Sequence, residues 1–271
     1  MSVASLDLAT TPPQKMKRTG NARGFAVPAV QVGILALIVG LWQWGASAHA
    51  INGSLFGSPA GIAASAARTW SDGSLLTDTA LTLWETVAGF VLGTVLGSVA
   101  GLGLWYTPFL ARVIEPAAVA INGVPKIAMG PLIIIWLGAG VESKIVLAFV
   151  STAIVAFLAA YAAAREVDRD LVTLLRSMGA TRAQTFRTLL VPGALPLIFS
   201  AMRINVGFAL VGAVVGEFIA SAHGLGHAVF VAGNMFDLNT VWLGIIVLSL
   251  IAAVLYAVLG AAERALVKGR S

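Results

Sequence analysis

Residues 168–196 read DRDLVTLLRSMGATRAQTFRTLLVPGALP, a basic stretch that stands between two long apolar runs. The apolar residues of its first half recur at the spacing of one helical face: Leu171, Leu174, Leu175 and Met178. Asp168 or Asp170 is placed to cap the first turn, and Gly179 stands where a left-handed residue ends a helix. The stretch therefore predicts a short amphipathic helix followed by a glycine turn.

A second helix is predicted directly after this turn. Thr181 and Gln184 have the spacing of a capping box. The apolar side of the second helix consists of Phe186, Leu189 and Leu190. Pro192 and Pro196 are expected to close the unit. The result is a helix-turn-helix presented on one side of a membrane.

Composition indicates a membrane protein that crosses the bilayer several times. The chain has 271 residues, of which 58% are hydrophobic and 11% charged, and its mean hydropathy is +0.91. These values are far from those of a soluble domain. The net charge of +5 lies in short loops, so it does not predict binding to nucleic acid. The chain has no cysteine, which excludes disulfides, and its three histidines are too scattered to predict a metal site.

Hydropathy predicts an all-α protein with a cytoplasmic tail (1–28) and a single transmembrane domain (29–271). The expected spans are residues 29–48, 80–105, 113–137, 145–164, 195–220 and 239–262. A surface helix is expected over Pro59–Trp70. Ala48-His49-Ala50 resembles a signal-peptidase site, but the preceding apolar run exceeds the ~7–15 residues of a signal sequence. We therefore expect the first span to be retained.

Basic residues predict the orientation of these spans. Of the 17 lysines and arginines, only Arg68 and Lys144 fall in segments expected outside, and Lys126 and Arg203 fall within spans. The other basic residues share one side with the N-terminus. Basic loops remain in the cytoplasm, so both termini and the loop 165–194 are expected there.

Glycine recurs every fourth residue in the second predicted span, at Gly89, Gly93, Gly97 and Gly101. Glycines at this spacing line one face and let another helix approach closely, which predicts a packing seam. A phosphate-binding glycine loop would need a preceding strand and a following Lys or Ser. Neither is present, so no nucleotide site is predicted in this chain.

The third predicted span is interrupted by Pro116, Gly123, Pro125, Gly130 and Pro131. Irregular backbone at membrane depth is tolerated inside protein or beside a water-filled path. A continuous helix would place Lys126 close to mid-bilayer, at ~1.5 Å per residue. Lys126 then either pairs with Glu115 or Glu217, snorkels along the kink, or provides a fixed positive charge for an anionic solute.

The candidate pathway residues are accordingly Pro125, Lys126, Pro131 and Glu217. Three other ionisable residues lie within spans: Glu85, Glu115 and Arg203. Glu85 and Glu115 are expected to reach the membrane interface, and Glu217 to lie near the outer face. Arg203 is expected to snorkel or to pair with a carboxylate.

The stretch 168–196 resembles the cytoplasmic loop of the membrane subunits of ATP-binding-cassette (ABC) importers. That loop has the pattern EAA, three residues, Gly, nine residues, Ile-x-Leu-Pro. Gly179 and Pro192 have the matching separation, with Leu189 and Val191 at the Ile and Leu positions, whereas Thr173, Leu174 and Leu175 replace EAA. The missing Glu removes one polar contact to the ATPase. The resemblance implies that the ATPase contacts are Thr173, Leu174, Leu175, Gly179, Ala180, Thr181, Leu189 and Pro192.

A second resemblance covers residues 55–265. Residues 125–144, PKIAMGPLIIIWLGAGVESK, are similar to the third-span signature of permeases for nitrate, sulfonates, taurine and bicarbonate. The segments TLWETVAGFVLG (82–93), REVDRDL (165–171), GFALVGAVVGEF (207–218) and GLGH (224–227) match that class in the same order.

This class implies a type I importer permease fold in the bacterial inner membrane. It also implies a homodimer, two ATPase subunits that hold ATP and Mg²⁺, and an extracytoplasmic substrate-binding protein. The chain itself would be no enzyme and carry no cofactor. The solute implied is small and anionic, such as a sulfonate, nitrate or carboxylate, although some members carry uncharged heterocycles.

Two other functional classes of membrane protein can be compared with the residues alone. An ion-coupled secondary carrier would need coupling carboxylates or inverted repeats near the midplane, whereas the acidic residues here lie mostly at span ends. An intramembrane enzyme would need a catalytic constellation. No Ser/His pair, paired aspartates or HExxH motif lies within the predicted spans.

Overall fold

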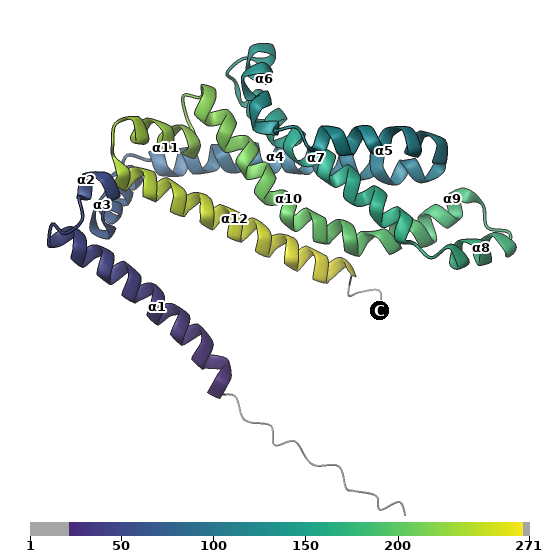
Figure 1. Ribbon diagram of the computed structural model, residues 1–271, viewed down its shortest axis with the longest axis horizontal. Helices are drawn as coiled ribbons and strands as arrows, with labels where there is room; N and C mark the ends of the chain where they lie inside the picture. The colour runs from purple at the N-terminus through teal and green to yellow at the C-terminus, as the bar shows by residue number, and fades with distance from the viewer. Residues whose placement is uncertain (1–21, 268–271) are drawn as a thin grey trace, which may run out of the picture.

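The computed structural model describes residues 22–267, and every regular element within them is helical (Figure 1). The long helices are α1 (Ala22–Ser47), α4 (Ser74–Gly103), α7 (Val141–Glu166), α10 (Val191–Ala220) and α12 (Leu238–Val267). The shorter helices are α2 (Gly53–Phe56), α3 (Pro59–Ser71), α5 (Pro108–Asn122), α6 (Gly130–Leu137), α8 (Arg169–Ser177), α9 (Arg182–Thr185) and α11 (Leu225–Asn234). Two 3₁₀ turns, η1 (Leu104–Tyr106) and η2 (Lys126–Met129), and one π-helical turn, η3 (Phe186–Leu190), complete the elements.

The predicted six spans and all-α class are confirmed. Five helical stretches are long and apolar enough to cross a membrane, and α5 with η2–α6, bent by 86°, makes a sixth when this pair is counted as one broken span. α1 begins at Ala22, within the predicted tail (1–28), and the part of α1 apolar enough to span a membrane is Val30–Ser47. The rest of the predicted tail lies outside the described residues.

Three of the spans form the core, with α7 packed between α4 and α10. The sequence of α7 explains why, since its buried face consists largely of Ala, Ser and Thr. Large apolar side chains of α4 and α10, such as Val95, Leu96 and Phe208, are exposed instead. Small residues inside and large ones outside are typical of helices that pack in lipid, where close backbone approach replaces the hydrophobic effect.

The glycine face of α4 lies directly against α7. A Cβ atom at Gly89 would stand 2.7 Å from the carbonyl oxygen of Ile145, and one at Gly93 would stand 2.8 Å from that of Phe149. Gly97 and Gly101 approach the backbone of α7 in the same way. Because these four positions have no side chain, the backbones of α4 and α7 can lie this close together.

The other two long helices lie outside this core. Figure 1 shows α1 diverging from the bundle, and most of its side chains are exposed. It is held at its C-terminal end, where the rings of Trp42 and Trp242 lie 5.3 Å apart and Gln43 accepts a hydrogen bond from the Ala60 amide. α12 packs along α10, α11 and α3.

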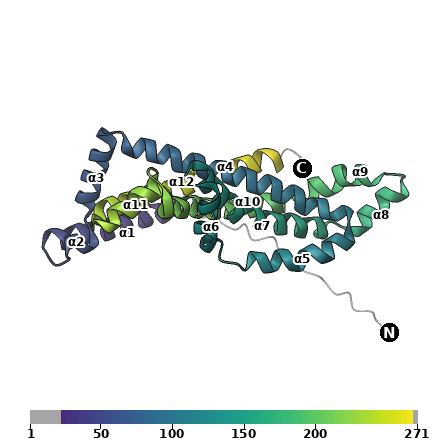
Figure 2. The same ribbon diagram turned by 90° about the horizontal axis from the view of Figure 1, so that it is seen from above.

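The bundle has two different ends. α8 and α9 project from one end, whereas α3 and α11 lie at the other (Figures 1 and 2). α3, predicted as a surface helix, begins with Ser58 as its N-cap and Pro59 in its first turn.

The prediction that Pro192 and Pro196 end the second helix of the loop is wrong. α9, the π-helical turn and α10 form one continuous helix, Arg182–Ala220, that contains both prolines. Pro192 lies two residues after the end of the π-helical turn Phe186–Leu190. The wider backbone of such a turn accommodates a residue that has no amide hydrogen and whose ring needs space in the preceding turn.

Candidate functional site

The hairpin formed by α8, the turn at Gly179 and α9, here called the α8–α9 hairpin, is built by local hydrogen bonds. The side chain of Asp168 accepts one from the amide of Asp170 at 2.8 Å. Gly179 has φ +84°, the left-handed conformation that its position predicts. Thr181 and Gln184 form the predicted capping box, with each side chain accepting from the other residue's amide.

An apolar face of this hairpin is uncovered. Leu174 is 54% exposed and Met178 is 75% exposed, at the tip of the hairpin. Thr173 is also exposed, and its hydroxyl donates to the Arg169 carbonyl within the same helix. An exposed apolar helix face flanked by arginines is a suitable surface for a protein partner.

The eight residues predicted to contact the ATPase lie on one continuous piece of chain. Thr173, Leu174 and Leu175 lie on α8, and Gly179 and Ala180 form the turn. Thr181 caps α9, Leu189 lies in the π-helical turn, and Pro192 lies in the first turn of α10.

Aromatic rings connect the hairpin to the bundle. The ring of Phe186, in the π-helical turn, lies 4.9 Å from Tyr106 and 5.9 Å from Trp105 at the end of α4. Leu190 is fully buried and packs with Leu102. A displacement of the hairpin would therefore reach both α10 and α4.

A groove of about 260 Å³ lies where the hairpin meets α7 and α10. Leu171, Leu189 and Leu197 line it together with the carboxylates Glu166 and Asp168. The groove thus combines an apolar floor with two acidic groups at the root of the hairpin.

Lys126 lies at the break of the bent span, immediately after exposed Pro125. Its ammonium donates to the carbonyl oxygen of Asn122 at 3.2 Å and to the side-chain oxygen of Asn122 at 3.1 Å. Pro131 is exposed in the first turn of α6. The depth estimate for Lys126 assumed a continuous helix, which is wrong, because α5 ends at Asn122 and the chain turns by 86°.

The expected pairing of Lys126 with a glutamate is also wrong. Glu115 accepts from Arg165 at 3.0 Å and from the Tyr161 hydroxyl at 3.1 Å. Glu217 is fully buried and accepts from the Thr82 hydroxyl and the Gly226 amide, whereas Lys126 is partly exposed. Within residues 22–267, Lys126 has no carboxylate within 4.0 Å. Of the four candidate pathway residues, Glu217 is thus buried, whereas Pro125, Lys126 and Pro131 are partly or fully exposed.

Buried charges gather at the end of the bundle opposite to the hairpin. Glu85, Lys144 and Glu217 are at most 1% exposed, although Glu85 was expected at the interface and Lys144 in an outer loop. Those two expectations are wrong. α7 begins at Val141 and already contains Lys144 in its first turn, and Glu85 lies on the buried face of α4 with Thr82 and Gly89. The sequence offered no local signal for this cluster, which joins residues from three helices.

Arg203 pairs with Glu263 of α12 and lies over the ring of Tyr256 at 5.6 Å. Of the two expectations for Arg203, pairing with a carboxylate is therefore confirmed. This pair joins α10 to α12.

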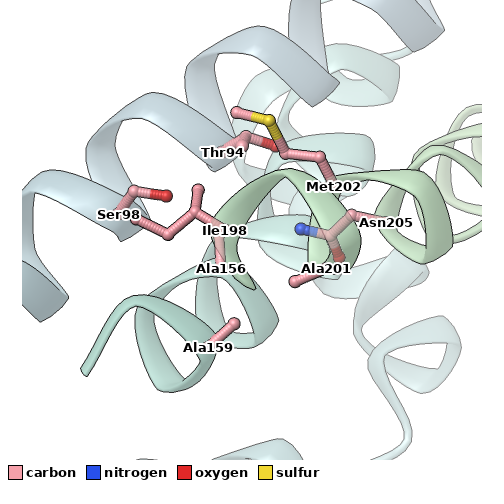
Figure 3. A pocket seen from close by; sticks show the side chains of 8 residues that line it. All are labelled: Thr94, Ser98, Ala156, Ala159, Ile198, Ala201, Met202 and Asn205. Atoms are coloured by element: carbon pink, nitrogen blue, oxygen red, sulfur yellow. The ribbon is translucent and has the colours of Figure 1, made fainter. Parts of the chain in front are cut away.

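Figure 3 shows a small space lined by residues of α4, α7 and α10. The hydroxyls of Thr94 and Ser98 and the amide oxygen of Asn205 are buried there without a hydrogen-bond partner among the described residues. The Asn205 amide nitrogen donates to the Thr152 carbonyl at 3.1 Å. The space is too narrow for a water molecule and has no charged lining, so we assign it to helix packing.

Across the described part of the chain, no three His, Cys, Asp or Glu side chains gather as metal ligands would. The structure thus contains three candidate functional features: the exposed α8–α9 hairpin, a lysine at a broken span and a buried polar cluster.

Residues 93–269 match the family described as binding-protein-dependent transport system inner membrane component. The chain is 32% identical over 252 residues to the riboflavin transport system permease protein of Chloroflexus aurantiacus, covering 93% of this chain and 94% of that protein. It is 28% identical to the taurine transport system permease protein of Escherichia coli, covering 88% of each. It is 26% identical to a putative aliphatic sulfonates transport permease protein of Bacillus subtilis, covering 94% of this chain and 90% of that protein.

Among solved structures, the chain shares its fold with the MetNI methionine ABC transporter in an inward-facing conformation. The TM-score is 0.55 at 24% identity, covering 67% of this chain and 94% of that one. This likeness confirms the predicted permease fold.

Proposed function

This chain belongs to the family of binding-protein-dependent transport system inner membrane components, and we propose that, as the permease subunit of an ABC importer, it forms a pathway for a small anionic solute. The ion-coupled carrier is thereby set aside. The relatives are transport permeases, and the energy for transport would come from ATP and Mg²⁺ on partner ATPase chains.

We assign a different protein partner to each end of the bundle. The exposed apolar face at Leu174 and Met178 would dock an ATPase subunit, and the rings around Phe186 would transmit its movement. We place this end, with both termini, on the cytoplasmic side of a bacterial inner membrane. A substrate-binding protein would dock at the end that carries α3 and α11, and a second copy of the chain would complete the pathway.

The position of Lys126 is the observation that supports an anionic solute. Its ammonium lies at a broken span, is partly exposed and, among the described residues, donates hydrogen bonds to Asn122 alone. A cation at such a position stabilises an anion in transit because no carboxylate neutralises it. A second candidate, an uncharged heterocycle, is favoured by the relatives that transport riboflavin and formylaminopyrimidine.

Lys126→Met and Lys126→Arg, in the complex reconstituted in proteoliposomes with its ATPase and binding protein, test the choice. For an anion such as a sulfonate, we expect Met to lower uptake about tenfold, equal to ~1.4 kcal/mol of barrier, and Arg to retain part of it. Assembly and ATPase co-purification should not change, because Lys126 makes only local contacts.

Equal uptake of the sulfonate by the wild type and Lys126→Met would refute the anion assignment. Uptake of riboflavin that is insensitive to Lys126→Met, with no uptake of the sulfonate by either protein, would establish the heterocycle instead.

A further inference from the structure

The buried cluster of Glu85, Lys144 and Glu217 lies outside everything that the proposed function uses. These residues come from α4, α7 and α10, and each is at most 1% exposed. A charged side chain buried at such a depth is costly unless partners compensate it. The partners of each residue therefore indicate which of them is charged.

Lys144 forms its hydrogen bonds with backbone carbonyl oxygens. Its ammonium donates to the carbonyl oxygens of Ala139, Gly140 and Ala220, which uses all three of its hydrogens. These carbonyls lie near the C-terminal ends of α6 and α10, where a positive charge is favourable. No carboxylate of the described residues lies within 4.0 Å of Lys144, so it forms no ion pair with either glutamate.

Glu217 accepts hydrogen bonds at both of its oxygens. Gly226, in the first turn of α11, donates its amide to Oε2 at 2.6 Å. The Thr82 hydroxyl lies 2.6 Å from Oε1 and itself accepts from the Leu225 amide at 2.9 Å. Glu217 is the acceptor that the described residues offer to the single hydrogen of the Thr82 hydroxyl. Glu217 is therefore surrounded by donors, as an ionised carboxylate requires.

Glu85 has the opposite surroundings. Both of its oxygens are buried without a hydrogen-bond partner among the described residues, and Glu85 lies one helical turn after Thr82, whose hydroxyl donates to Glu217. Two ionised carboxylates in contact repel each other strongly. A proton on Glu85 removes this repulsion and provides the missing donor.

We propose that Glu85 and Glu217 form a proton-binding site in which neutral Glu85 donates a hydrogen bond to ionised Glu217. The shared proton joins α4 to α10, and Glu217 in turn holds the N-terminus of α11. The other charged or titratable groups around the pair are Asp78 of α4, which accepts from the Gly224 amide, Glu142 and Lys144 of α7, and His223 and His227 beside Gly224 and Gly226.

The site also gives a reason for the sequence GLGH at 224–227. A Cβ atom at Gly226 would lie 2.6 Å from Oε2 of Glu217 and 2.8 Å from the Val214 carbonyl oxygen. A residue with a side chain there would push the amide away from the carboxylate.

Substituting each glutamate by glutamine locates the proton. In Glu85→Gln, the amide donates to Glu217 as the acid does, so we expect a melting temperature within ~2 °C of the wild type. In Glu217→Gln, one oxygen is replaced by a donor that faces either Thr82 or Gly226, so a buried donor loses its acceptor. We expect melting to fall by about 5 °C or more. Glu115→Gln, at the partly exposed pair with Arg165, is the control and should melt as the wild type does.

Infrared spectroscopy of the full-length complex gives a readout independent of folding yield. The wild type should show the carbonyl band of a buried protonated carboxyl group, which Glu85→Gln abolishes and Glu115→Gln retains. The proposal is overturned if the band persists in Glu85→Gln, if it is absent from the wild type, or if Glu85→Gln melts as low as or lower than Glu217→Gln. If Glu85→Gln melts as low as or lower than Glu217→Gln, the proton lies on Glu217 or a cation is bound at Glu85.

Discussion

Glycine is needed for different physical reasons in α4 and in the α8–α9 hairpin. In α4, Gly97 has ordinary helical backbone, but a Cβ atom there would lie 3.0 Å from Cβ of Ala156 and 3.1 Å from the carbonyl carbon of Ala153. In the hairpin, Gly179 has open space around it and φ +84°. The first glycine is required by a neighbouring helix and the second by its own backbone. The first should therefore control stability, and the second the position of an exposed surface.

The largest effect is expected at the helix contact. Gly97→Leu would force α4 away from α7 along the seam, so we expect a loss of ~3 kcal/mol or more of stability, or no folded protein. Gly103→Leu is the matched control, because a Cβ atom added at Gly103, at the end of the same helix, would meet no atom of another element within 4 Å. Thermal melting and size-exclusion chromatography of both variants measure the difference. Equal behaviour would mean that the α4–α7 contact is not as close as described.

A smaller effect on stability is expected at the two left-handed glycines, Gly179 and Gly73. Both have open space around them, with φ +84° and +79°, but they lie at opposite ends of the bundle. Valine at either position should cost about 1–3 kcal/mol through backbone strain. Only Gly179→Val should lose ATPase co-purification and transport, because only that turn sets the direction of the proposed docking face. Normal transport by Gly179→Val, or equal losses in both variants, would refute the coupling role.

The smallest effect is expected for Gly179→Asn. Asparagine adopts the left-handed conformation more readily than other side chains, so we expect a cost below ~1 kcal/mol and nearly normal ATPase co-purification. A loss as large as that of Gly179→Val would show that the absence of a side chain, and not the backbone conformation, matters at the docking face.

The hairpin could be predicted from the sequence because its determinants are local. The partners of the capping box are three residues apart, and the left-handed turn follows from Gly179 after an amphipathic helix. Packing of the α4 glycines against a helix could be predicted from their spacing, although the sequence did not identify α7 as the partner. The span count followed from hydropathy, which needs no knowledge of tertiary contacts.

The parts that sequence reasoning missed depend on distant partners. Thr82 and Glu217 are 135 residues apart, and Lys144 is held by a carbonyl 76 residues away. A lysine near a span end looks the same in sequence whether it faces water or the end of another helix. The prediction that Pro192 ends a helix is wrong for a related reason. The rule that proline ends a helix is local, whereas the π-helical turn before it depends on the packing of Phe186 and Leu190.

The distance between Thr82 and Glu217 has a consequence for how the protein is made. A ribosome adds about 5–20 residues per second, so the 135 residues between them correspond to roughly 7–27 s of synthesis. During that time α4 has left the ribosome, but the acceptor for Glu85 on α10 does not yet exist. A neutral Glu85 enters the bilayer at a much lower cost than an ionised one. The proton would then be acquired during membrane insertion, well before the helix that shares it.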